Sequence, residues 1–331
     1  MAKRILFCTL LFLLIQNIGT LCDAPDAHII YVHLGDAIPP YAYIAFEQAR
    51  LFNEHAAIVL IANTKALEQS SYDFAHYRIT TIACETLQES EWHTHFKSHS
   101  ALDPTTLDGF WRKTTERFFY LHEYIALHHI KGAVHMEYDT MLYADIAQMK
   151  YVFSHYKGIA AVFDCDTRCI PCFLYIADAT ALTHLVQFIA AHAHQQYNDM
   201  QLLALYHNNT TPDYIDLLPL IMPEYVIDHT LMNKRRQTTK TPHLYWRHIE
   251  LFDSIFDGAA LGQYLGGIDP RNGFSKPGFI NETCLFNPSH ITIEWHLDEK
   301  NRKIPFAICH NKAYRINNLH IHSKKLEKFR S

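Results

Sequence analysis

Apolar residues occur in short, regularly spaced blocks over the first part of this chain. A run rich in isoleucine, valine and tyrosine over 27–34 predicts a buried strand, which Pro39-Pro40 ends. Residues 41–53 follow with helical spacing, and 57–62 form a second apolar strand. This order of strand, helix and strand predicts an α/β protein with a parallel sheet, in which ligands gather at the carboxyl ends of the strands.

Polar residues stand where these two strands are expected to end. His33 and Gly35 follow the first strand, and Asn63 follows the second. They are candidate ligand contacts, with simple turn residues as the alternative reading.

A longer helix is predicted over 108–130, where aromatic residues supply a packed face. Arg112 and Arg117 lie near that face and are placed to reach a phosphate, unless they form surface ion pairs. Gly132 then leads into the apolar segment that ends at Asp139.

That segment delivers two acids one residue apart, Glu137 and Asp139. In an extended backbone, residues two apart point to the same side, so the two carboxylates can hold one divalent cation between them. A solvated strand end is the alternative. The preceding helix and Gly132 place the acids at a strand terminus, which favours a site for a metal and a diphosphate.

Two later segments carry further candidate chemistry. Residues 256–272 are glycine-rich and contain Asp257 and Asp269, but they match neither the Walker phosphate loop nor the dinucleotide fingerprint. In 316–326, His320 and His322 share one side of an extended run, and Lys324 follows. Imidazole can complete a carboxylate metal site, and an ammonium group neutralises phosphate oxygens.

Composition limits the classes of protein. With 331 residues, 49% of them apolar and 13% aromatic, the chain can bury a large core as one domain or two lobes. The formal net charge is -5, and the basic cluster Lys234-Arg235-Arg236 is short. No nucleic-acid partner is therefore expected.

The N-terminus has the three-part form of a secretory signal. Lys3-Arg4 precedes an apolar run over 5–15, and small residues follow near 22–24. We expect residues 1–24 to be a cleaved signal peptide that exports the protein, with a retained membrane anchor as the alternative.

Export would leave six cysteines in an oxidising compartment. This even number favours disulfides, whose connectivity the sequence does not reveal. The cluster Cys165, Cys169 and Cys172 is alternatively a zinc site, although a second ligand pair at the usual spacing is missing.

Taken in order, these segments resemble a GT-A type glycosyltransferase, a family that uses nucleotide-sugar donors, over most of the chain after residue 24. The motifs are Ile38-Pro39-Pro40-Tyr41, Glu47-Gln48-Ala49-Arg50, Phe110-Trp111-Arg112, Arg117-Phe118-Phe119, His135-Met136-Glu137-Tyr138-Asp139, Gly262-Gln263-Tyr264-Leu265-Gly266-Gly267 and Leu319-His320-Ile321-His322-Ser323-Lys324. Glu-x-Asp stands where the family has Asp-x-Asp. This degenerate form can still bind a hard cation.

The resemblance implies a single GT-A domain over 25–331, with a Rossmann-like, mainly parallel sheet flanked by helices. Residues 25–150 would bind the nucleotide sugar, and 151–331 would form the acceptor half and the C-terminal tail. The implied activity is hexosyltransferase-like. The implied partners are a nucleotide-sugar donor and a glycan, lipid or protein acceptor, with membrane association only if the N-terminal segment is retained.

The resemblance also implies roles for the metal-site residues. Glu137 and Asp139 would hold Mn²⁺ or Mg²⁺, completed by His320 or His322, while Lys324 contacts the diphosphate.

His33, Asn63, Arg112 and Arg117 are the further candidates for donor binding. Asp257 is the candidate general base, with Asp269 as its substitute.

Two other classes stay open. A secreted glycoside hydrolase would also use paired acids, but with carboxylates about 5 to 10 Å apart. A secreted, non-catalytic carbohydrate-binding protein would bind no nucleoside diphosphate.

Overall fold

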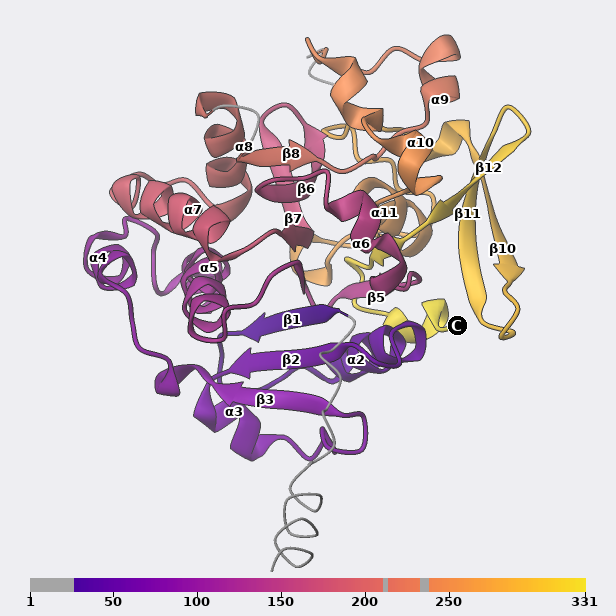
Figure 1. Ribbon diagram of the computed structural model, residues 1–331. Coiled ribbons are helices and arrows are strands. Elements are labelled where there is room, and N and C mark those ends of the chain that lie inside the picture. Colours follow the sequence, from indigo (N-terminus) through magenta and orange to yellow (C-terminus); the bar gives the residue numbers. More distant parts are fainter. Residues whose placement is uncertain (1–26, 211–213, 233–237) are drawn as a thin grey trace, which may run out of the picture.

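The computed structural model describes residues 27–210, 214–232 and 238–331 (Figure 1). The predicted signal segment, residues 1–24, and the cluster Lys234-Arg235-Arg236 lie outside these ranges. The strands are β1 (His28–His33), β2 (Ala57–Ala62), β3 (Ile79–Ala83), β4 (Ala133–Met136), β5 (Thr140–Leu142), β6 (Ile159–Cys165), β7 (Arg168–Ile176), β8 (Ile215–Leu217), β9 (Ser254–Ile255), β10 (Thr292–Leu297), β11 (Lys303–Cys309), β12 (Lys312–Ile316) and β13 (Asn318–His320). The helices are α2 (Pro40–Phe52), α3 (Thr64–Gln69), α4 (Glu91–His99), α5 (Phe110–Leu127), α6 (Lys150–Phe153), α7 (Ala179–Ala191), α8 (Asp199–Asn209), α9 (Pro223–Asp228), α10 (Ile249–Phe252) and α11 (Ala260–Gly266).

A seven-stranded sheet in the order β3-β2-β1-β4-β7-β6-β8 forms the centre of the molecule. Strand β7 alone runs antiparallel to its two neighbours, β4 and β6, and the other pairings in this sheet are parallel. Strands β1, β2 and β4 are almost wholly buried, as expected for parallel strands covered on both faces. The predicted α/β class with a mainly parallel sheet is confirmed.

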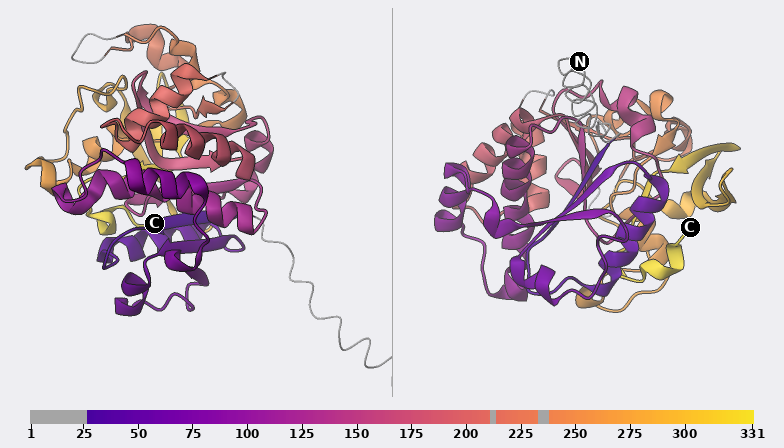
Figure 2. Two further views of the ribbon diagram at one scale, coloured as in Figure 1. Left: turned by 90° about the vertical axis from the view of Figure 1, so that its left-hand side faces the viewer. Right: turned by 60° about the horizontal axis from the view of Figure 1, so that its bottom comes forward.

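Helices cover both faces of this sheet (Figure 2). Helix α2 packs Phe46 edge-on against Tyr31 of β1, with ring centroids 4.8 Å apart. Helices α5 and α7 lie on the opposite side of the strands in Figure 2. The predicted helix over 108–130 is observed as α5, which begins after Gly109 in a left-handed conformation.

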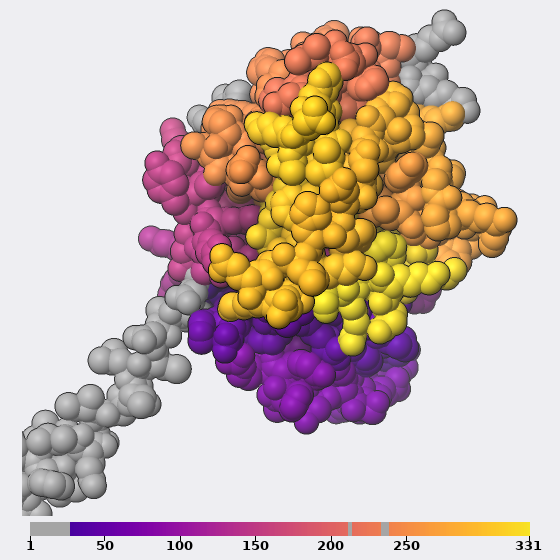
Figure 3. All heavy atoms as spheres, turned by 90° about the vertical axis from the view of Figure 1, so that its right-hand side faces the viewer, coloured from indigo at the N-terminus to yellow at the C-terminus, as the bar shows by residue number. Residues whose placement is uncertain are grey.

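The C-terminal third returns to the N-terminal part of the chain. Strands β10, β11, β12 and β9 form a second sheet, and β13 pairs with β5 as a separate two-stranded ribbon. The last residue, Ser331, contacts Gln48 of α2 through its hydroxyl at 2.7 Å. Figure 3 shows the C-terminal residues lying against the N-terminal region. Both parts of the sequence therefore build one side of the molecule.

The expected disulfides are not formed. Each cysteine in the described ranges is a free, buried thiol. The cysteines of β6 and β7 instead pack within the core, since the environment of a sheet interior suits a small apolar thiol. The possible metal-ion group found among the described residues contains no cysteine, so the zinc alternative gains no support. Among those same residues, no helix is long and apolar enough to cross a membrane.

Helices α4 and α5 are joined by a buried ionic network. The ring of His93 is fully buried, with Nε2 3.1 Å from Glu116 Oε1 and Nδ1 3.0 Å from Glu123 Oε1. Both ring nitrogens can donate only in the protonated imidazole. Burial alone would lower the pKa of His93, but Glu116 and Glu123 raise it to about 9.

We predict that His93 makes the stability of the fold pH-dependent. Its folded-state pKa of about 9 exceeds the ordinary value of 6.5. The stabilisation is therefore fully present below pH 6.5 and is lost as the pH rises through 9. The substitution His93→Gln should lower the free energy of unfolding at pH 6.5 by about 3 kcal/mol. Urea unfolding between pH 6.5 and 10 measures this, with the exposed His95→Gln on the same helix as control. Equal pH slopes for wild type and His93→Gln would contradict the prediction.

Candidate metal centre

The two acids of the predicted metal pair lie in a tight turn between β4 and β5. The Thr140 backbone N–H donates to the Glu137 carbonyl at 3.1 Å, which closes the turn. The predicted extended backbone through Glu137 and Asp139 is therefore wrong. The carboxylates nevertheless meet, because the turn folds Asp139 back beside Glu137 at the carboxyl end of β4.

His320 is brought to the acids by strand pairing. Strand β13 runs antiparallel to β5, with His320 opposite Thr140, the residue after Asp139. The Nε2 atom of His320 lies 3.3 Å from Glu137 Oε2 and 3.3 Å from Asp139 Oδ2. On the other side of the ring, Nδ1 is 2.7 Å from the Gly258 carbonyl oxygen. A carbonyl can only accept, so Nδ1 donates the proton and Nε2 faces the acids.

This donor set fits a hard divalent cation. The ligand atoms of Glu137, Asp139 and His320 all lie within 4.8 Å of one another. Neighbouring ligands of an octahedral ion with bonds of about 2.1 Å are separated by about 3 Å, close to the spacing here. Two carboxylates with one imidazole suit Mn²⁺ or Mg²⁺ and leave positions for phosphate oxygens and water.

Lys324 supplies a positive charge at the same place. Its ammonium group is hydrogen-bonded to Asp139 and lies 3.6 Å from Asp269 Oδ2. Burial alone would raise the pKa of Asp139, but Lys324 and His320 hold it well below its ordinary value. Asp139 is therefore held in the ionised form, which is the form that binds a metal cation.

A second ion pair, which the sequence did not predict, supports Glu137. Arg117 on α5 donates to Glu137 Oε1 at 2.5 Å and to Asp199 Oδ2 at 2.6 Å. Burial alone would lower the pKa of Arg117, but Glu137 and Asp199 raise it. Asp199 begins α8, where its side chain was indistinguishable from an ordinary first-turn acid.

Asp257, the predicted general base, is fully buried in this structure. Its two oxygens accept backbone N–H groups of Leu261 at 2.9 Å, Gly262 at 2.8 Å and His320 at 2.9 Å. Burial raises the pKa of Asp257 to about 6, although these N–H groups oppose the rise. The carboxylate thus ties the start of α11 to the strand that carries His320.

The approach of α11 to His320 explains one glycine. A Cβ atom at Gly262 would lie 1.9 Å from the His320 carbonyl oxygen, a distance that no side chain tolerates. Close contact between α11 and β13 thus requires glycine here.

Asp269, the substitute base, is held by a neighbour. The Arg271 guanidinium contacts both its oxygens, with Nη2 to Oδ2 at 2.8 Å. The same guanidinium lies over the Phe110 ring at 4.6 Å. The segment after α11 is thereby attached to the first residue of α5.

The remaining predicted site residues, His322, His33, Arg112 and Asn63, make contacts outside the Glu137, Asp139 and His320 group. The His322 ring lies tilted against that of His320, with ring centroids 4.0 Å apart, but His322 is not part of the possible metal-ion group. His33 pairs with the Tyr138 hydroxyl at 3.1 Å through Nδ1. Arg112 instead donates to the Lys97 carbonyl at 2.6 Å. Asn63 accepts the Gly35 backbone N–H at 2.7 Å.

Asn63 and Gly35 line a cavity of about 300 Å³ at the carboxyl ends of the first parallel strands. Its other walls are Leu34, Asp36, Lys65, Glu85, Lys113, Glu116 and Tyr120.

Comparison with known proteins gives distant similarities to solved structures only. No protein-family model matches the sequence, and no curated protein matches it significantly. Apo mouse xyloside xylosyltransferase 1 is similar over 61% of this chain and 90% of its own, with 10% identity and a TM-score of 0.41. The galactosyltransferase LgtC with donor and acceptor sugar analogues is similar over 66% and 82%, with 12% identity and a TM-score of 0.41. A cytidylyltransferase from Leptospira borgpetersenii is similar over 58% and 75%, with 11% identity and a TM-score of 0.34.

We predict that Mn²⁺ binding depends on the three clustered side chains. Asp139→Asn or His320→Gln should weaken Mn²⁺ binding at least tenfold, because each removes a ligand from the set. His322→Gln should bind Mn²⁺ like the wild type. Paramagnetic resonance of free Mn²⁺ during protein titration measures the affinities, and circular dichroism verifies folding. Undiminished binding by folded Asp139→Asn would rule out this site.

Proposed function

We propose that this protein is a GT-A type hexosyltransferase that moves a sugar from a nucleotide-sugar donor to a glycan, lipid or protein acceptor with divalent-metal assistance. The observation that carries the proposal is the meeting of Glu137, Asp139, His320 and Lys324 at the carboxyl end of β4. Two carboxylates, an imidazole and an ammonium group are the side chains that a metal-bound diphosphate needs.

The 300 Å³ cavity beside this centre suits the nucleoside of the donor. It is lined by residues that follow β1, β2 and β3, where ligands bind in open α/β sheets. Lys65 and Lys113 line it together with Asp36, Glu85 and Glu116, so its walls carry both donors and acceptors for the polar groups of a nucleoside. The donor would therefore lie along the sheet edge from this cavity to Glu137 and Asp139.

The proposed chemistry is stabilisation of the leaving group. Sugar transfer breaks the bond between the sugar and the diphosphate, so negative charge builds on the diphosphate oxygens. A bound Mn²⁺ or Mg²⁺ would act as a Lewis acid on those oxygens. Lys324 would add a direct cationic contact, exchanging its pairing with Asp139 and Asp269 for phosphate.

The geometry favours this function over the two alternatives. A glycoside hydrolase needs two carboxylates on opposite sides of the scissile bond. Here Glu137 and Asp139 converge on one imidazole nitrogen, each at 3.3 Å. A non-catalytic carbohydrate-binding protein has no need for two adjacent acids, one buried and one half-buried, that are paired with Arg117 and Lys324.

Activity should depend on Asp139 and on the metal. With a panel of uridine and guanosine diphosphate sugars, the wild type should release nucleoside diphosphate, and EDTA should abolish this release. Asp139→Asn should lower kcat at least 100-fold, since charge stabilisation at a reacting centre is typically worth two to three orders of magnitude.

Asp298→Asn is the matched control, because its carboxylate pairs with Arg302 on the β10–β11 hairpin. Calorimetry with UDP and GDP, each with Mn²⁺, gives an independent readout. Absence of heat with every common nucleoside diphosphate would refute the function.

We also propose that the protein is exported through its N-terminal segment. The charge and hydropathy pattern of residues 1–24 supports a cleaved signal, with a retained membrane anchor as the other form. Mass spectrometry of protein recovered from a secreting host should give a chain that begins near residue 25. Recovery of only the intact chain in membranes would favour the anchor.

A further inference from the structure

Two charged groups near the metal centre have unused hydrogen-bonding capacity. Asp164 is fully buried at the end of β6, and Arg168 Nη2 donates to its Oδ2 at 2.8 Å. Neither Asp164 Oδ1 nor Arg168 Nε has a partner, although both atoms are buried. Because nearly all buried polar atoms in native proteins are satisfied, such a pair calls for a further polar partner, either a water or a group of a ligand.

A third unsatisfied group links this pair to the metal centre. His322 Nε2 is buried and has no partner, and its ring lies tilted against that of His320. Gly258 contacts both Asp164 and His320. Its carbonyl accepts His320 Nδ1 at 2.7 Å, and a Cβ at Gly258 would lie 2.7 Å from Asp164 Oδ1. Only Gly258 thus separates Asp164 from His320, a candidate metal ligand.

The loop of residues 267–285 frames this region. At its start, Asp269 lies 3.6 Å from Lys324, beside the acids of the metal centre. At its end, the Leu285 backbone N–H donates to the Asp164 carbonyl at 2.8 Å, and Cys284 Sγ lies 3.5 Å from Arg168. The loop therefore runs from the diphosphate side of the centre to the unsatisfied Asp164–Arg168 pair.

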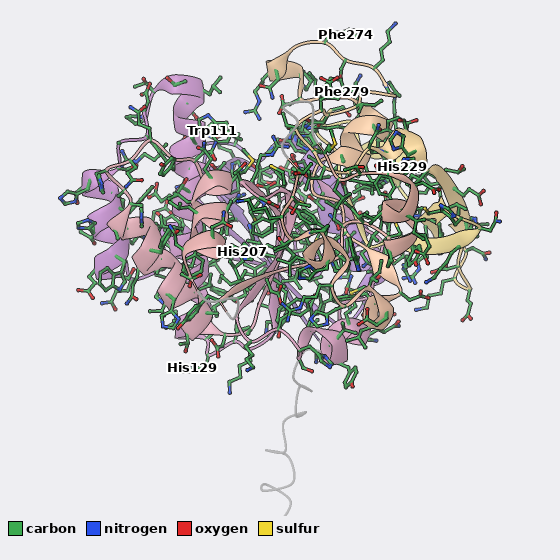
Figure 4. The ribbon with its side chains drawn as sticks, turned by 90° about the horizontal axis from the view of Figure 1, so that it is seen from above. Trp111, His129, His207, His229, Phe274 and Phe279 are labelled. Carbon is green, nitrogen blue, oxygen red and sulfur yellow. The ribbon has the colours of Figure 1, made fainter. Side chains whose placement is uncertain are left out.

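The tip of this loop exposes an aromatic ring. Phe274 is 86% exposed, and Cβ atoms placed on Gly273 or Gly278 would meet nothing within 4 Å. Figure 4 shows Phe274 and Phe279 on one side of the molecule's upper edge and Trp111 of α5 across from them. An exposed aromatic ring that borders a site is a typical ligand contact, since its flat face packs on apolar groups.

Resting on the proposed function, we propose that the acceptor is a carbohydrate that binds between the 267–285 loop and the Asp164–Arg168 pair. Arg168 and His322 hydrogen-bond its hydroxyl groups, while Asp164, packed against Gly258, holds Arg168 in place. Phe274 packs on the apolar face of a sugar ring further out. The Arg168 side chain is 25% exposed and provides the entrance from solvent.

The test is binding of the full chain to a glycan array in the presence of UDP or GDP and Mn²⁺. Wild type should bind a defined set of glycans, and Phe274→Ala and His322→Gln should each weaken that binding at least tenfold. Tyr151→Ala is the matched control, because this ring is 72% exposed on α6. Helix α6 lies near His28, at the end of the sheet opposite the candidate site.

Calorimetry with the same nucleotides separates the two proposals. Nucleotide and Mn²⁺ binding should remain unchanged in Phe274→Ala and His322→Gln. If wild type binds nucleotide but no glycan, or if both variants bind glycan as wild type does, the acceptor site is refuted. If wild type binds no nucleoside diphosphate, the proposed function itself fails.

Discussion

The candidate site depends on the antiparallel pairing of β13 with β5. This pairing sets His320 opposite Thr140 and so places an imidazole against two acids that precede it by more than 180 residues. Asp257 reinforces it, because one carboxylate binds the His320 N–H together with the first N–H groups of α11. The absence of a side chain at Gly262 lets α11 approach closely enough for these bonds. A displacement of β13 would therefore separate the imidazole and Lys324 from the acids together.

Buried charge imposes a second constraint on the same place. An unpaired buried carboxylate costs several kcal/mol, and Glu137 and Asp139 each have a cationic partner. Arg117 neutralises Glu137 from α5, and Lys324 neutralises Asp139 from the C-terminal segment. These contacts differ in consequence. Each cation is shared by two acids, but the Arg117 side chain is 7% exposed and the Lys324 side chain 20%, so Lys324 is the more accessible to an incoming anion.

Local sequence patterns predicted the helices and strands, because these are determined by residues close together in sequence. Apolar spacing located β1, β2, α2 and α5 to within a few residues, and the polarity of their ends located Asn63 and the acid pair. Contacts between distant segments were not predictable in this way. Arg117 meets Asp199 across 82 residues, and nothing near Asp199 distinguishes it from a helix-capping acid. Asp257 shows a second limit. The sequence around it does not distinguish a buried carboxylate that binds backbone N–H groups from an accessible general base.

The distribution of unsatisfied groups bears on which reaction this site can serve. Arg117 Nε and Asp199 Oδ1 lack partners where α5 meets the start of α8, while Arg168 Nε, Asp164 Oδ1 and His322 Nε2 lack partners near Gly258 and His320. Glu137 and Asp139 lie where the two regions meet. A protein that binds a single sugar needs only one set of such groups. If the proposed function holds, two such sets on either side of Glu137 and Asp139 would suit a reaction that joins two polyhydroxyl molecules, because each needs its own hydrogen-bonding surface next to the bond that is exchanged.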